Sequence, residues 1–320
     1  MNRICALVFL MLFAVEASAA DCDRVCLKDM MTTYLNALVA RDPSKAPLAA
    51  NVRFTEDSKD LKVGEGFWKT ATKVGDYRQD FIDVKEQTIV SHVIVEESGK
   101  PAKYTARLKV ANGKITEIET LVVPSGAQTA GGANFVVRPD IGVEPPASQK
   151  NKREELVRIA DFYPRGLTVG GFDKVDAPFA TDAFRIENGN VMAGPGCGGA
   201  RGGAPRGAAP ANTNGANAGG APTVSARAPQ DVAGCANIKT QGIIAHPDLT
   251  KSVVAVDEEQ GTVVIWMNFG DTGTYGAGNA LVLFEAFKVF GGQLHVVQAF
   301  MKVLPKDTQR GWGKTLKGTE

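Results

Sequence analysis

The sequence contains the same succession of segments twice, and this repeat constrains the fold more than any other feature. Each half begins with a helix-like stretch, continues with a short apolar segment and ends in a series of strand-like runs. Tyr34 aligns with Tyr163 at an offset of 129 residues. Glu56 aligns with Glu187 at an offset of 131 residues. A repeat of this length predicts two structural units of one kind, each with its own core.

Each half has the pattern of an α+β unit. In the first half, Tyr34 and Leu38 belong to an apolar series with helical spacing. The strand-like runs that follow end in two strands joined by Asn112-Gly113, which is a strong hairpin signal. Gly291-Gly292 stands at the corresponding place in the second half.

A long insertion separates the early and late strands of the second half. Gly113 aligns with Gly292 at an offset of 179 residues, so the offset has grown by 48 since the Glu56 landmark. Residues 198–234, rich in Gly, Ala, Pro and Asn, account for most of that growth. We expect this low-complexity insertion to be solvated rather than part of a core.

The first twenty residues have the composition of a secretory signal. Arg3 precedes an apolar run that ends in small residues, and the run is too short to span a bilayer comfortably. A membrane anchor is the alternative interpretation. We therefore predict a protein exported to the periplasm or secreted, and divide the chain into a signal peptide (1–20), a first unit (21–124), a linker (125–151) and a second unit (152–310).

Four cysteines remain after the signal peptide, an even number that suits an oxidising compartment. The spacing of Cys22 and Cys26, one helical turn, favours a disulfide between them. Cys197 and Cys235 flank the insertion, and a disulfide between them would close it at its base. A metal site is the alternative for Cys22 and Cys26, although the histidines show no matching ligand spacing.

The charge pattern excludes some partners. The net charge is +1, and Lys and Arg are scattered, so we expect no nucleic acid and no membrane as partner. No phosphate loop, dinucleotide fingerprint, metal motif or Ser-His-Asp order occurs, and we expect no cofactor and no metal.

Two pairs of segments carry a resemblance to a known family. LNALVARDPSKAPLAANVRFTED with VANGKITEIETLV, and APFATDAFRIEN with KVFGGQLHVVQAFMKVLP, resemble the NTF2-like superfamily, and more narrowly its SnoaL-like and ketosteroid-isomerase-like members. The resemblance implies an α+β fold class, with two tandem cone domains in which a curved antiparallel sheet wraps around helices. It also implies a conical pocket in each unit. Such domains commonly pair through their sheets, which would occur here within one chain or in a homodimer.

Strand alternation then predicts which side chains enter the pocket of the second unit. His295, Val297, Ala299 and Met301 share one face of the last strand, and the resemblance places that face inward. The same register places Phe284 and Ala286 inward in the second unit, and Arg107 inward in the first.

His295 is the candidate acid or base, because an imidazole in an apolar cone titrates near neutrality. The alternative is a buried histidine that binds a backbone carbonyl, and His92 and His246 are weaker candidates. Asp161 would carry a proton if it were buried. Tyr163 would donate to a developing oxyanion, as a helix tyrosine does in ketosteroid isomerases. The residues predicted to line a ligand site are Trp266, Asn268, Phe284, Tyr275 and Met301, with Arg107 and Tyr34 in the first unit.

These features predict a cofactor-independent enzyme that transfers protons. The expected reaction is a lyase, dehydratase or isomerase step on a hydrophobic, in particular an aromatic, small molecule. The alternative is a module that binds a small molecule or a protein without converting it. Fold-level resemblance alone does not choose between them.

Overall fold

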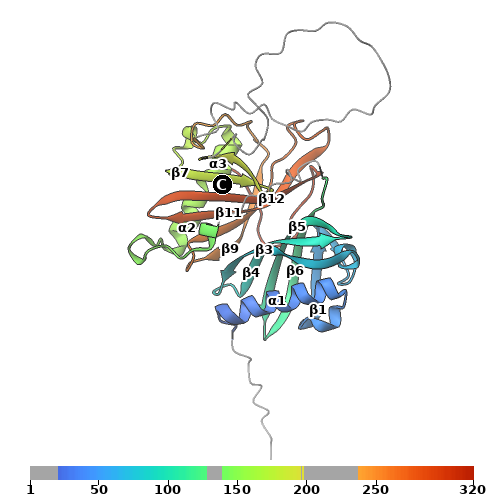
Figure 1. Ribbon diagram of the computed structural model, residues 1–320. Coiled ribbons are helices and arrows are strands. Elements are labelled where there is room, and N and C mark those ends of the chain that lie inside the picture. Colours follow the sequence, from blue (N-terminus) through green and yellow to red (C-terminus); the bar gives the residue numbers. More distant parts are fainter. Residues whose placement is uncertain (1–20, 128–138, 196, 198–236) are drawn as a thin grey trace, which may run out of the picture.

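The computed structural model describes residues 21–127, 139–195, 197 and 237–320 (Figure 1). The predicted signal peptide, the insertion and Cys235 lie outside these residues. The same holds for part of the linker. The signal peptide and the Cys197–Cys235 disulfide therefore stay predictions, as do the unit boundaries.

The first sheet has six strands in the order β2-β1-β6-β5-β4-β3. All neighbours are antiparallel except β1 and β6, which are parallel. The strands are β1 (Leu48–Glu56), β2 (Lys59–Leu61), β3 (Ala71–Asp83), β4 (Thr88–Glu97), β5 (Lys100–Ala111) and β6 (Lys114–Val123).

The second sheet repeats this order and adds one short strand, giving β8-β7-β12-β11-β10-β9-β13. Its single parallel pair, β7 with β12, corresponds to β1 with β6. The strands are β7 (Phe179–Glu187), β8 (Asn190–Ala193), β9 (Thr250–Asp257), β10 (Thr262–Asn268), β11 (Asn279–Phe290), β12 (Gln293–Pro305) and β13 (Leu316–Lys317). The predicted fold class, two tandem α+β units of one topology, is confirmed.

Helices cover one face of each sheet. In the first unit, α1 (Arg24–Ala40) begins at Asp23, whose side chain accepts a hydrogen bond from the Cys26 backbone N–H. In the second unit, α2 (Arg153–Ala160) and α3 (Phe162–Val169) take this place. Short 3-10 segments connect the elements: η1 (Pro43–Lys45), η2 (Gly66–Lys69), η3 (Pro139–Gly142), η4 (Ala147–Gln149) and η5 (Asp173–Val175).

The predicted disulfide between Cys22 and Cys26 is present at the start of α1. Its two Cα atoms are 5.2 Å apart, within the range that a disulfide spans. No helix within the described ranges is both long and apolar enough to cross a membrane.

Each unit has an apolar interior between its sheet and its helices. A third buried cluster lies between the two sheets, whose outer faces pack on each other. Phe81, Val90 and Leu121 come from the first sheet. Trp266, Phe284 and Val296 are among the residues from the second. One face of each sheet is therefore buried by the helices of its own unit, and the other is buried by the opposite sheet. A side chain on the second face lies outside the cone.

Candidate functional site

His295 does not face the interior of the second unit, and the reason is a β-bulge. Lys288 pairs with Val296 but Val289 pairs with Leu294, so His295 is an extra residue in β12. A bulge interrupts the alternation of side chains. Beyond it the predicted register holds, because Val297, Ala299 and Met301 belong to the interior cluster as expected. The predicted orientation of His295 is wrong.

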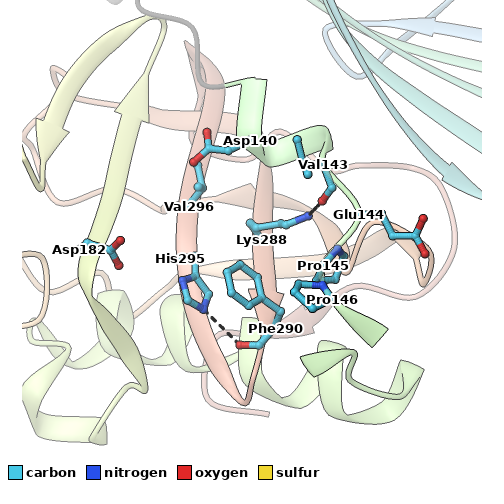
Figure 2. Close-up of a pocket in the computed structure, with 10 residues that line it drawn as sticks. All are labelled: Asp140, Val143, Glu144, Pro145, Pro146, Asp182, Lys288, Phe290, His295 and Val296. Atoms are coloured by element: carbon cyan, nitrogen blue, oxygen red, sulfur yellow. Dashed lines mark hydrogen bonds between the residues drawn. The ribbon is translucent and has the colours of Figure 1, made fainter. Parts of the chain in front are cut away.

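His295 instead lines a pocket of about 200 Å³ on the outer face of the second sheet (Figure 2). Its Nε2 lies 3.2 Å from the Phe290 carbonyl oxygen, and its ring stacks on the Phe290 ring. Burial lowers the pKa of His295 below its usual value. This contact agrees with the alternative interpretation of the sequence, in which the histidine binds a backbone carbonyl.

Phe284, Ala286 and Trp266 also face away from the interior. They belong to the cluster between the sheets, because even-numbered positions of β10 and β11 point there. Asn268 lies on the same face, and its amide donates hydrogen bonds to the carbonyls of Lys306 and Thr308. The first three face the first sheet, and Asn268 holds the C-terminal segment, so the predicted inward orientation is wrong for this group.

Arg107 and Asp161 take part in ion pairs instead of lining a cone. The Arg107 Nη2 lies 2.7 Å from Glu117, on the outer face of the first sheet. Arg107 was predicted to face inward, but the inward residues of β5 are its even-numbered neighbours, such as Ala106 and Leu108. Asp161 ends α2 and accepts a hydrogen bond from the Lys251 Nζ.

Tyr34 is fully buried in the interior of the first unit, where its hydroxyl lies 2.7 Å from that of Tyr104. Tyr163, Met301 and Tyr275 lie in or against the interior cluster of the second unit. These are the predicted residues that the structure brings together there.

The interior of the second unit also holds three charged side chains that sequence reasoning missed. Glu285 of β11 is 1% exposed and Arg185 of β7 is 5% exposed. Glu187 follows two residues later on β7, and its Oε1 lies 3.3 Å from the Arg185 Nε. Strand register explains the grouping, because Glu285 and Glu187 both pair with Ala299, from opposite sides. Ala299 is small, so nothing on the intervening strand fills the space between the two carboxyl groups.

Two polar atoms of this group are buried without a hydrogen-bond partner: the Oε2 of Glu285 and the Nε of Arg185. The Arg185–Glu187 contact is thus an ion pair without good hydrogen-bond geometry. An unpaired polar atom in an apolar interior is costly. Two of them in one interior indicate a place where a ligand or water completes the bonding.

The surroundings favour the neutral form of one acid and the charged form of one base. Burial raises the pKa of Glu285 well above its usual value, and the negative charge of Glu187 acts in the same direction. Burial alone would lower the pKa of Arg185, but Tyr163 and Glu187 outweigh it and the pKa is raised. The Tyr163 hydroxyl is close enough to both groups to influence their pKa values. The group is thus a carboxyl whose protonated form is favoured, beside the ion pair of Arg185 with Glu187.

The first unit has a different set at the equivalent positions. Glu56 pairs with Thr120, and Thr120 pairs with Ala106, so this row corresponds to Glu187, Ala299 and Glu285. An alanine therefore stands where the second unit has its buried acid. Burial raises the pKa of Glu56 to about 7, although a hydrogen bond from the Phe67 N–H opposes this.

The missed residues carried a signal in the sequence. Glu285 is the one acid within the run ALVLFEAFKVF, and Arg185 interrupts AFRIE in the same way. Charged side chains in strands that are otherwise fully apolar are rarely tolerated unless they are paired or functional.

The chain is similar to proteins that share this fold. Residues 149–301 match a family model described as a domain of unknown function (DUF8021). None of the curated proteins matches the chain. The NTF2-like protein of unknown function from Cytophaga hutchinsonii is 14% identical, with 30% of this chain and 88% of that chain covered and a TM-score of 0.26.

Two further solved structures have similar values. The putative hydroxylase AclR from Streptomyces galilaeus is 12% identical, and the match covers 32% of this chain and 82% of that chain, with a TM-score of 0.26. The steroid delta-isomerase from Pseudomonas aeruginosa has the same identity, coverage and TM-score. Each of these similarities covers about a third of the chain at low identity, and the narrower SnoaL-like resemblance stays a prediction.

Proposed function

We propose that the interior of the second unit binds a small, largely apolar molecule with a polar oxygen, and that Glu285 exchanges a proton with it. The ligand class is the hydrophobic or aromatic one expected from the sequence. The reaction class is a lyase, dehydratase or isomerase step. The acid in this proposal is Glu285, because His295 lies on the other face of the sheet.

The observation that carries the proposal is the pair of unsatisfied atoms, Glu285 Oε2 and Arg185 Nε, in an otherwise apolar interior. A neutral carboxyl group can donate its proton to a ligand oxygen and accept one back as a carboxylate. The Arg185 guanidinium stays charged and stabilises negative charge as it develops on that oxygen. Tyr163 contacts both groups and orients them.

The mostly apolar lining restricts the ligand. Leu283, Phe287, Val297 and Met301 belong to the same interior cluster. Such a surface favours a ligand that buries a ring or hydrocarbon part against it and presents one polar end to Glu285. The ion pair of Arg185 with Glu187 cancels the net charge, so we expect a ligand that is uncharged before the proton moves.

The test uses the full chain and a panel of aromatic and polyketide-like ketones, enols and hydroxyl compounds. Binding is followed by ligand-observed NMR and turnover by absorbance. Glu285→Gln keeps the shape of the side chain and removes its acid. We expect this variant to lose at least about 100-fold in turnover while it still binds the ligand.

Glu56→Gln is the matched control, because Glu56 occupies a row of the first sheet that corresponds to the row of Glu285. We expect it to leave turnover unchanged. Binding without turnover in the unmodified protein, or equal turnover in Glu285→Gln, would favour the alternative of a non-catalytic binding module.

We also propose that the protein is exported. The apolar segment at residues 1–20 supports this, and the Cys22–Cys26 disulfide suits an oxidising compartment. Cell fractionation with and without residues 2–19 tests it, and protein recovered equally from the cytosol in both cases would refute it.

A further inference from the structure

A second site lies on the opposite face of the second sheet, in the pocket of about 200 Å³ shown in Figure 2. Lys288 of β11 forms part of its wall. Pro145, Pro146 and Phe290 give it apolar surface, and His295 and Asp182 lie along another side. The pocket is smaller than those that hold drug-sized molecules, so an occupant has few heavy atoms.

Lys288 is an unusual lysine, because it is 2% exposed and forms no ion pair with a carboxylate of the residues that the structure describes. Within the described part of the chain its Nζ donates to two backbone carbonyls, those of Val143 and Gln260. Buried lysines usually lie next to a counter-ion. Lys251 is such a case: it is 4% exposed, and its Nζ lies 2.5 Å from the Asp161 carboxylate.

Two carbonyl acceptors match the needs of a neutral amine better than those of an ammonium group. A neutral amine has two N–H bonds and one lone pair, whereas an ammonium group has three N–H bonds. With both carbonyls occupied, the neutral form leaves its lone pair unused. Lys288 is also one of the residues that line the cavity.

Burial of Lys288 agrees with this description. Burial lowers the pKa of Lys288 to about 8, against the opposing influence of Asp257, Asp140 and Glu144. Asp182 from β7 and His295 from β12 complete the titratable groups that line the pocket around it. A lysine with a lowered pKa is nucleophilic near neutral pH.

We propose that this pocket is a covalent site for small aldehydes or ketones, with the Nζ of Lys288 as the nucleophile. The Nζ lone pair forms a bond to the carbonyl carbon, and the carbonyl π electrons move to the oxygen. A proton passes from the nitrogen to this oxygen through water in the pocket, with His295, which lines the same pocket, as the exchanging acid and base, giving a carbinolamine. The hydroxyl group then takes up the remaining N–H proton through the same water and leaves as water when the C–O bond breaks, and the electron pair left on nitrogen forms the C=N bond. The products are one imine and one water, and no oxidant or reductant is needed.

The test is reductive trapping in the full chain. Butanal and sodium cyanoborohydride are added between pH 6 and pH 9, the hydride of cyanoborohydride reduces any imine, and peptide mass spectrometry measures butyl addition at each lysine. We expect Lys288 to be labelled at least about tenfold faster than Lys251, with half-maximal rate near pH 8. Equal labelling of the two lysines at every pH would overturn the proposal and leave Lys288 as a structural residue.

Two variants separate the roles of the side chains. Lys288→Arg keeps hydrogen-bond donors for the two carbonyls, and we expect it to remove labelling of this segment without changing the melting temperature. His295→Asn should slow labelling of Lys288 several-fold without moving the pH midpoint. An unchanged rate in His295→Asn would refute the proton relay. Labelling by a bulky aromatic aldehyde as fast as by butanal would refute the pocket as the place of reaction.

Discussion

A single buried acid gives the second unit its chemical character. Glu285 is surrounded by apolar residues and has one oxygen without a partner. Retaining such a group lowers the stability of the fold, because a polar atom is removed from water without full compensation. Selection for stability alone would not retain such a group, so its presence indicates a functional requirement.

This gives a prediction about stability. Glu285→Leu should raise the free energy of unfolding by about 1–3 kcal/mol, because an apolar side chain replaces an incompletely bonded one. Urea denaturation of the variant and the unmodified protein measures the difference. A loss of stability would mean that the bonds of Glu285 with Tyr163 and its neighbours hold the fold together.

Glu56 gives a pH-dependent prediction in the first unit. Its pKa is about 7 in the folded protein and near 4.5 in the unfolded chain, so the unfolded state releases its proton first as pH rises. The contribution of Glu56 to stability should therefore fall between pH 4.5 and pH 7, by about 3 kcal/mol. In Glu56→Gln this decline should be absent. Parallel stability curves for the two proteins over this range would contradict the assignment.

At the level of elements, β12 shows how one extra residue changes the face of the sheet on which a side chain lies. Alternation from Val297 to Met301 was predictable, because the sequence has period two there. The outward orientation of His295 was not predictable. The bulge at His295, opposite Lys288 and Val289, has no recognisable signal in the sequence. The predicted acid thus lies on the strand next to that of Glu285 and on the opposite face of the sheet.

The last element is a C-terminal segment that contacts both sheets. Arg310 is 4% exposed and makes two hydrogen bonds to Glu119 of β6. Its Nη1 also donates to Ser252 of β9. Trp312 donates its Nε1–H to Thr55 and lies under the Arg53 guanidinium. The segment therefore fastens the second unit to the first.

Arg310→Ala should lower the free energy of unfolding by about 3–5 kcal/mol, because it leaves the buried Glu119 carboxylate with only the 3.6 Å ion pair to Arg107. Lys73→Ala is the control, since Lys73 forms an exposed pair with Glu96 and should change stability by less than about 1 kcal/mol. Thermal and chemical unfolding measure both. Similar small effects would show that Arg310 is dispensable for the contact.

At the level of the whole molecule, the contact between the sheets contains a histidine that cannot easily take up a proton. His92 is fully buried, stacks on Phe300 and has an Nε2 without a partner. Burial lowers its pKa to about 3. The unfolded chain binds a proton near pH 6.5, so its contribution to stability is present above that pH and is lost as the pH falls toward 3.

We expect acid to destabilise the unmodified protein more than the His92→Leu variant. Between pH 7 and pH 4.5 the extra loss should be about 2–3 kcal/mol. Unfolding midpoints measured across this range give the comparison, with His295→Asn, a half-buried histidine elsewhere, as control. An equal loss in all three proteins would show that His92 is not the acid-sensitive group.

The overall arrangement was largely predictable because the repeat, the hairpin glycines and the helix spacing agree with one another. The site was not predictable to the same degree. Tyr163 and Met301 could be placed from helix and strand periodicity. The roles of Glu285 and Arg185 could not be predicted, because they depend on which face of the sheet the other unit covers.

Because both sheets belong to one polypeptide, their association does not depend on protein concentration. Two separate chains of this kind would meet by collision, and dilution would drive them apart. Here the tether makes the encounter first order, so the melting temperature should be the same at micromolar and nanomolar protein. The tether also frees the halves from being identical, which allows one to keep an alanine where the other has an acid.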